Sequence, residues 1–344
     1  MIHRPRLTGD PRADHRLLQE ALDTVPGGRL ELPPGTHVIA GGLTVRSGWT
    51  IRGAETSAAG GGPPASTLQC TGTGGHPVLH VLGSDVSISD LGLRPPPADP
   101  GEHGGDRGTA ITVGEYLYGA APEWIHTVDV RRVHVHRPDG DRAANSIALM
   151  GAVRDVTLHD ITVRGGYTGV AVHWGAVGAD VSTISGPTYH PHHLTITDLR
   201  VSGAVEGFYL SSVHDVRVAG ACLRDVEMGF RLLPGDNTDR FAPDGQAAIG
   251  ARIDISDVCT RWTGDKYGVR VAGWGRSEID GLVSVLGYTD TVIRDCVITR
   301  ADRADGSWSP IVIERAGTVE LRDITLHQHT TTPDARCCPV SPAA

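Results

Sequence analysis

The chain is poor in the large side chains that fill most helical cores. Its 344 residues include only three Phe and three Met, whereas Gly (45) and Pro (22) are abundant. A core left to Val, Leu, Ile and Ala, with many turn residues, favours short strands. A basic excess is also missing, because the formal net charge is −9. This charge argues against a surface that follows nucleic-acid phosphates, and we expect no nucleic-acid partner.

Targeting and membrane segments are missing as well. The polar N-terminus, with His3, Arg4 and Arg6, has no apolar core typical of a secretory signal. No apolar run approaches the roughly 20 residues that a membrane span requires. We therefore expect a cytoplasmic protein without a membrane partner.

The six cysteines do not have the spacing of zinc ligands. In a reducing compartment, we expect Cys70, Cys222, Cys259 and Cys296 to be small buried thiols rather than disulfides. The vicinal pair at 337–338 lies in a Thr- and Pro-rich tail, where it is either redox-active or without a role.

Two repeated patterns run through most of the chain. The first is apolar-x-Asp-apolar-x-apolar, and its Asp is a turn residue that can bond neighbouring backbone N–H groups, so we assign it a structural role. Its Asp positions are 90, 160, 198, 295 and 323, with degenerate copies at Arg132, Gly220 and Asp257. The second is an apolar-x-apolar triplet before each copy, at 79–81, 111–113, 147–149, 170–172, 208–210, 230–232, 269–271 and 311–313. Such registered repeats predict a solenoid whose longer spacings contain insertions.

The N-terminal region predicts a cap. Leu17, Leu18, Ala21 and Leu22 have helical spacing behind an acidic capping candidate, Asp14. The run LLQEALDTVPGGRLELPPGTHVI (17–39) resembles the N-terminal cap and first coil of the pectate-lyase-like superfamily of right-handed parallel β-helices. The resemblance concerns the fold and implies no catalytic residue.

We predict an all-β fold: a right-handed, single-stranded parallel β-helix of about nine coils with a short N-terminal capping helix. Residues 1–42 would form the cap and first strands, residues 43–327 the β-helix with a loop-walled groove, and residues 328–344 a C-terminal tail.

Most insertions leave the coil from one edge, after the triplet, and should wall one face. They cover residues 114–126, 174–190, 234–248 and 273–289. The floor of this groove is the middle residue of each triplet, where Tyr209, Arg231 and Arg270 would form one column. Two arginines on adjacent rungs are costly unless an anion neutralises them. That anion is either a carboxylate of the protein or one of the substrate.

The predicted catalytic residues are His173, Tyr209, Arg231 and Arg270. An imidazole suits general acid–base work, and a tyrosine beside an arginine can exchange a proton. The predicted substrate-binding residues are Trp174, Tyr189, His190, Asp236, Asp239, Trp274 and Glu314. We predict no cofactor and no metal, because the floor is basic or neutral and offers no calcium ligands.

The resembled superfamily contains uronate lyases, galacturonan hydrolases and mannuronan epimerases, which implies an acidic sugar. We predict an enzyme of the lyase or isomerase class, using β-elimination, epimerisation or isomerisation on a carboxylate-bearing sugar or related substrate. A hydrolase is disfavoured, because the Asn-Thr-Asp at 237–239 is not followed by Asp-Asp or Gly-His-Gly motifs. One alternative is a cytosolic isomerase or cyclase of a small-molecule pathway, and another is a non-catalytic glycan-binding or assembly module. The partner is thus a small-molecule or oligosaccharide substrate.

Overall fold

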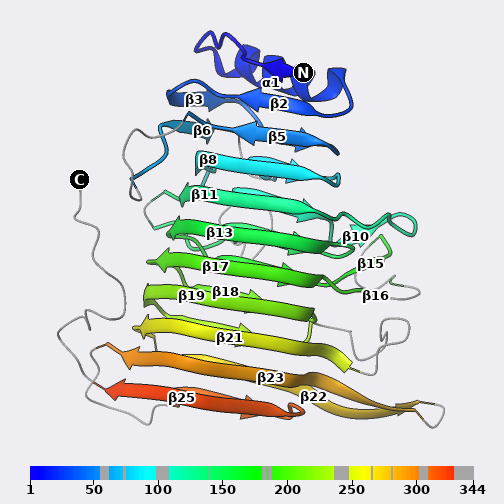
Figure 1. Cartoon of the computed structure of the whole chain (residues 1–344), viewed down its shortest axis with the longest axis vertical. Coiled ribbons are helices and arrows are strands. Elements are labelled where there is room, and N and C mark those ends of the chain that lie inside the picture. Colours follow the sequence, from blue (N-terminus) through cyan, green and yellow to red (C-terminus); the bar gives the residue numbers. More distant parts are fainter. Residues whose placement is uncertain are drawn as a thin grey trace.

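The computed structural model describes residues 1–54, 62–72, 75–97, 108–138, 140–179, 184, 188–235, 248–264, 266–279, 282–301 and 309–328. Within these ranges the chain winds into a right-handed parallel β-helix whose coils stack as rungs (Figure 1). The fold class predicted from the two repeats is confirmed.

The first coil is covered by one helix, α1 (Pro11–Thr24), seen at the top of Figure 1. Asp10 caps it by accepting hydrogen bonds from the backbone N–H groups of Arg12 and Ala13. The capping candidate Asp14 lies instead in the first turn, where it is buried and accepts from the N–H of Thr8. None of the described helices is both long and apolar enough to span a membrane.

Long strands form the larger sheet, sheet A, which faces the viewer in Figure 1. Its members are β1 (Ile2–His3), β2 (Gly28–Glu31), β3 (Gly35–Ile39), β5 (Trp49–Arg52), β6 (Ser66–Cys70), β8 (Val86–Arg94), β11 (Val128–His136), β13 (Arg154–Arg164), β17 (His192–Ser202), β19 (His214–Val226), β21 (Ala248–Trp262), β23 (Leu282–Arg300) and β25 (Val319–Gln328). Successive rungs pair in parallel, so equivalent residues of neighbouring coils lie in columns.

The triplets form the opposite face, sheet B, with short parallel strands. Its members are β4 (Leu43–Val45), β7 (Leu79–Val81), β9 (Ile111–Gly114), β12 (Ile147–Met150), β14 (Thr168–His173), β18 (Glu206–Leu210), β20 (Met228–Leu232), β22 (Val269–Ile279) and β24 (Ile311–Glu314). The first and third residues of each triplet from 79–81 to 269–271 are buried in the core, where Phe208 stacks on Phe230 with ring centroids 4.5 Å apart.

The recurring Asp bends each long strand of sheet A. Asp160 and Asp198 have φ values of 53° and 54°, a left-handed conformation that Asp tolerates better than most residues. The degenerate copies at Arg132, Gly220 and Asp257 adopt the same conformation, with φ of 50°, 70° and 53°. The left-handed bend supports the structural role assigned to this position, although Asp90 and Asp160 accept hydrogen bonds from the side chains of Arg132 and Arg200 rather than from the backbone N–H groups expected.

The cysteines differ in part from expectation. Cys222 and Cys259 are register partners on β19 and β21, and both are disulfide-bonded. The expectation of free thiols is wrong for this pair, because the parallel register sets the two side chains next to each other on adjacent rungs. Cys70 and Cys296 are free and buried, as expected. The pair at 337–338 lies outside the described residues.

Candidate functional site

The outer face of sheet B carries the column that the triplets predict. Tyr209 is the register partner of Arg231, and Arg231 is the partner of Arg270. Ala171 occupies the same position one coil before Tyr209, and Val312 one coil after Arg270. Between Ala171 and Val312, Tyr209, Arg231 and Arg270 thus form a polar run of three consecutive rungs.

Arg231 is neutralised from within the protein by Glu206, at the start of β18. Its Nη2 donates to Oε2 of Glu206 at 3.1 Å, and its Nε lies 3.1 Å from Oε1. The Glu206 side chain is completely buried, and Thr168 Oγ1 donates to its Oε2 at 3.3 Å. Burial raises the pKa of Glu206, although the charge of Arg231 acts in the opposite direction.

A continuous series of contacts links Arg231 to His173. The Arg231 guanidinium lies over the Tyr209 ring, 4.1 Å from its centroid, in cation–π geometry. The His173 ring meets Tyr209 edge-on, with ring centroids 5.2 Å apart. Burial, assisted by the charge of Arg231, lowers the pKa of His173 to about 4. His173 is therefore neutral at pH 7 and able to accept a proton.

Arg270 lies in a more open environment. Its Nη2 donates to Oε2 of Glu314 at 2.9 Å, and its side chain is 31% exposed against 53% for Glu314. Its guanidinium also lies 5.7 Å from the ring centroid of Tyr267. Glu314, predicted to bind substrate, thus makes an ion pair with a predicted catalytic arginine.

Two insertions meet beside this face and form an aromatic wall. β10 (Leu117–Tyr118) pairs with β15 (Gly175–Val177), which pairs with β16 (Thr188–Tyr189) in a small separate sheet. Figure 1 shows these strands together at one end of the sheet A rungs. Within the wall, Tyr189 contacts Tyr118 and Trp124 edge-on, both at 5.9 Å between centroids. Tyr189 and Trp124 remain partly exposed.

The other predicted substrate-binding residues are placed differently. Trp174 is only 2% exposed and packs edge-on against Tyr116, and His190 is 3% exposed and stacks on His214. Trp174 therefore joins the two insertions and His190 joins the wall to β19, and neither faces an open groove. Asp236 and Asp239 lie outside the described residues, as does the side chain of Trp274.

Sequence reasoning missed Glu206 and Tyr267. Glu206 is the register partner of Thr168 and Met228, so a carboxylate stands where the adjacent coils have a hydroxyl or an apolar group. This difference between Glu206 and the equivalent residues of the neighbouring coils is the sequence feature that could have identified it. Among the described residues, no group of three or more His, Cys, Asp or Glu is arranged to hold a metal ion.

Solved structures share this fold. The enzymatically active domain of tailspike protein 2 from bacteriophage CBA120 matches with a TM-score of 0.56 and 12% identity, over 91% of this chain and 40% of that chain. A tailspike protein double mutant of E. coli bacteriophage HK620, in complex with a pentasaccharide, matches with a TM-score of 0.51 and 12% identity, over 96% of this chain and 61% of that chain. The chain thus spans less than two thirds of either protein, and these identities show the fold alone. No protein-family model matches the chain, and no curated protein matches it.

Proposed function

We propose that the chain is a carbohydrate-active enzyme that acts on an acidic glycan at the outer face of sheet B. The observation that carries this proposal is the contact series His173, Tyr209, Arg231, with Glu206 buried behind the arginine. It places two groups that can exchange protons beside a permanent cation, as acid–base chemistry next to a carboxylate requires.

The proposed reaction begins at the carbon next to the substrate carboxylate. His173 or Tyr209 takes the proton from this carbon, and the arginines stabilise the enolate that forms. Either the C–O bond on the neighbouring carbon then breaks and the departing oxygen takes a proton from the other of these two groups, which is β-elimination, or that group returns a proton to the same carbon on the opposite face, which is epimerisation. The partly exposed rings of Tyr189 and Trp124 offer apolar faces for sugar rings. The pentasaccharide complex of a protein with this fold supports a glycan as substrate.

The test is a panel of uronate-containing and neutral polysaccharides incubated with the purified chain. Unsaturated uronate absorbance reports elimination, proton exchange with inversion seen by NMR reports epimerisation, and new reducing ends report hydrolysis. We expect one of the first two on a uronate glycan. No product from any member of the panel would contradict the proposal.

Two substitutions tie the activity to the contact series. We expect Tyr209→Phe and His173→Gln each to lower kcat by about 100-fold or more, the usual contribution of a proton-transferring group. The control is His80→Gln, because His80 belongs to the same column on β7, four coils before Tyr209. Full activity in both site variants would exclude this site.

The paired arginines also favour a second candidate, a non-catalytic glycan-binding module. Glu206 and Glu314 already neutralise Arg231 and Arg270, so less of their charge is available to stabilise an enolate during catalysis. Binding of a glycan without any product, retained in Tyr209→Phe, would support this candidate over the enzyme.

A further inference from the structure

Tyr267 belongs to a second column on the outer face of sheet B, beside the column that contains the arginines. It precedes the triplet 269–271 by two residues, just as Glu206 and Met228 precede their triplets. The repeat therefore places Tyr267 two rungs after Glu206 and on the same rung as Arg270.

Tyr267 contacts the more open of the two arginines. Cζ of Arg270 lies 5.7 Å from the centroid of the Tyr267 ring, and the guanidinium donates a hydrogen bond to the phenol oxygen. Only 8% of Tyr267 is exposed, but the Arg270 side chain is 31% exposed, so the hydroxyl lies beside the part of the site that solvent reaches. No described residue accepts the proton of this hydroxyl, which leaves the proton available to a substrate.

The arginine pair has a phenol on each side. Arg231 lies over the ring of Tyr209, its register partner on the rung before, and Tyr267 belongs to the rung after. Burial raises the pKa of Tyr267, although the charge of Arg231 acts in the opposite direction. Tyr267 therefore keeps its proton at neutral pH and can act as a neutral hydrogen-bond donor.

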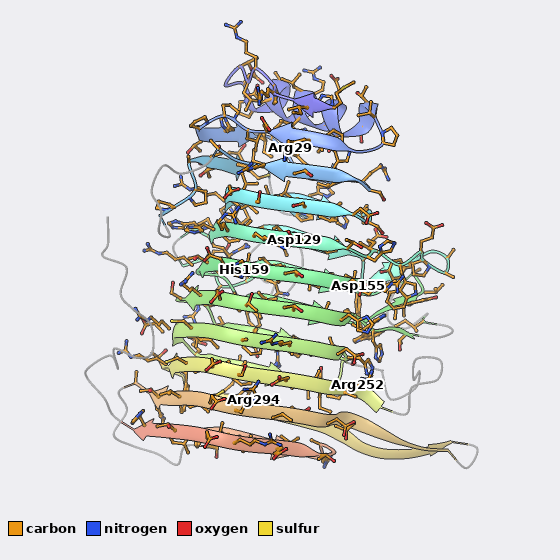
Figure 2. The ribbon with its side chains drawn as sticks, in the orientation of Figure 1. Arg29, Asp129, Asp155, His159, Arg252 and Arg294 are labelled. Carbon is orange, nitrogen blue, oxygen red and sulfur yellow. The ribbon has the colours of Figure 1, made fainter. Side chains whose placement is uncertain are left out.

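Arginines on the outer face of sheet A have different surroundings. Arg131 lies 2.6 Å from Asp129, and Arg294 lies 3.2 Å from Asp254. Figure 2 shows Asp129 and Arg294 among the charged side chains of both signs that cover this face. The two described contacts between an arginine and a tyrosine ring both lie on sheet B. The combination of guanidinium and phenol is therefore a property of the site rather than of the repeat.

We propose that Tyr267 is a further catalytic residue, which donates a hydrogen bond to the substrate carboxylate as it becomes an enolate. This role rests on the proposed function, because it requires a substrate carboxylate beside Arg231 and Arg270. When His173 or Tyr209 takes the proton, the electron pair of the broken C–H bond forms a C=C bond, and negative charge grows on the carboxylate oxygens. A donor aimed at that growing charge lowers the barrier.

A neutral donor adds to what the arginines supply. Glu206 and Glu314 offset part of the charge of Arg231 and Arg270, whereas the Tyr267 hydroxyl is engaged in no ion pair. Its hydrogen bond strengthens as the accepting oxygen becomes more negative. Tyr267 keeps its own proton throughout, so the proton-transferring groups stay the same.

The test is the kinetics of Tyr267→Phe on the glycan that the wild type converts. We expect kcat to fall by about 100-fold, the usual loss when one donor to a developing oxyanion is removed. KM should change little, because the interaction is strongest in the transition state. The pH dependence of kcat should keep its wild-type shape, since Tyr267 transfers no proton, whereas Tyr209→Phe should alter it.

The matched control is Tyr167→Phe. Tyr167 is a partly exposed phenol whose charge also acts on Arg231, but it lies one residue before the second column, on the rung of Thr168. It should keep wild-type kcat. Each variant removes only a hydroxyl group, and thermal denaturation of both shows that the fold is retained.

The outcomes separate this role from the proposed function. Unchanged kcat in Tyr267→Phe, with an active wild type, would reject the role of Tyr267 and leave the proposed function standing. A loss confined to KM, an equal loss in Tyr167→Phe, or a changed pH dependence would also overturn it. No product from the wild type with any glycan would reject both, because no enolate would then form at this site.

Discussion

Arg231 and Arg270 are neighbours in one column, yet their surroundings differ. Glu206, the partner of Arg231, is completely buried, whereas Glu314, the partner of Arg270, is 53% exposed. A buried carboxylate that loses its partner keeps the full cost of its desolvation, while an exposed one returns to water. The two arginines should therefore respond very differently to the same substitution.

We predict that Arg231→Ala destabilises the protein by about 3–5 kcal/mol, because it strands the Glu206 carboxylate in the interior. Arg270→Ala is the matched control on the next rung and should cost no more than about 1 kcal/mol. Chemical denaturation of both variants measures the difference. The double variant Arg231→Leu/Glu206→Leu should regain most of the lost stability, and equal losses in the two single variants would contradict the argument.

The sequence was sufficient to predict the column but not the partner of Arg231. Alternation within a strand and the repeat between coils decide which side chains face outward, so Tyr209, Arg231 and Arg270 could be aligned without a structure. The Arg231–Glu206 contact depends on how β18 begins, and the burial of Trp174 and His190 depends on how two insertions pack. Neither the repeat nor the composition contains that information.

At the scale of the strand, the left-handed bend is the element that repeats most strictly. Asp257 occupies this position with φ of 53°, is exposed, and makes no ion pair with another described residue. We predict that Asp257→Ala costs about 1–2 kcal/mol, because Ala tolerates the left-handed region poorly. Asp257→Gly should cost less, since Gly220 already holds the equivalent place. Thermal denaturation of the two variants measures both losses of stability. A larger loss for Asp257→Gly than for Asp257→Ala would contradict the conformational explanation.

The aromatic wall joins the β-helix through a pair of buried histidines. His190 Nδ1 lies 3.3 Å from His214 Nε2, and Thr188 Oγ1 lies 2.9 Å from His190 Nε2. Burial, assisted by Arg252, lowers the pKa of His214 to about 4, although Asp215 acts in the opposite direction. Protons therefore bind His214 more readily in the unfolded chain than in the folded one.

It follows that the contribution of neutral His214 to the free energy of unfolding is fully present above the pKa of His in the unfolded chain, near 6.5. This contribution is lost as the pH falls toward 4. We predict that His214 alone accounts for a loss of about 2 kcal/mol between pH 7 and pH 5. The free energy of unfolding, measured by urea denaturation at pH 7 and at pH 5, should differ less between the two pH values for His214→Gln than for the exposed control His76→Gln. An unchanged difference would show that His214 is not the group responsible.

For the molecule as a whole, the repeats predicted the coils well and the insertions poorly. The insertion at 273–289 extends β22 and β23 as an antiparallel pair, and those at 114–126 and 174–190 contribute the small sheet of β10, β15 and β16. Because the sequence pattern of a coil recurs, aligning one coil with the next predicts the strands of both. An insertion occurs once, and its strands pair within the same insertion or with another insertion, which no repeat reveals.

The disulfide of β19 and β21 adds a covalent link to a molecule otherwise held by contacts between neighbouring coils. Cys222 and Cys259 are 37 residues apart (259 − 222), and closing a loop of that length in the unfolded chain is worth about 4 kcal/mol by chain entropy. We predict that a reductant, or Cys222→Ser/Cys259→Ser, lowers the denaturation midpoint, and that reductant has no further effect on the double variant. Cys70→Ser, which removes a free thiol, is the control for reductant sensitivity.

If reductant leaves the denaturation midpoint unchanged, the disulfide adds no stability to that of the hydrogen-bonded strands. A clear loss would bear on where the protein works, because structural disulfides persist in oxidising compartments and are rare in the cytosol. It would favour a location outside the cytoplasm over the cytoplasmic one expected from the sequence. That location is also where an enzyme acting on an acidic polysaccharide would meet its substrate.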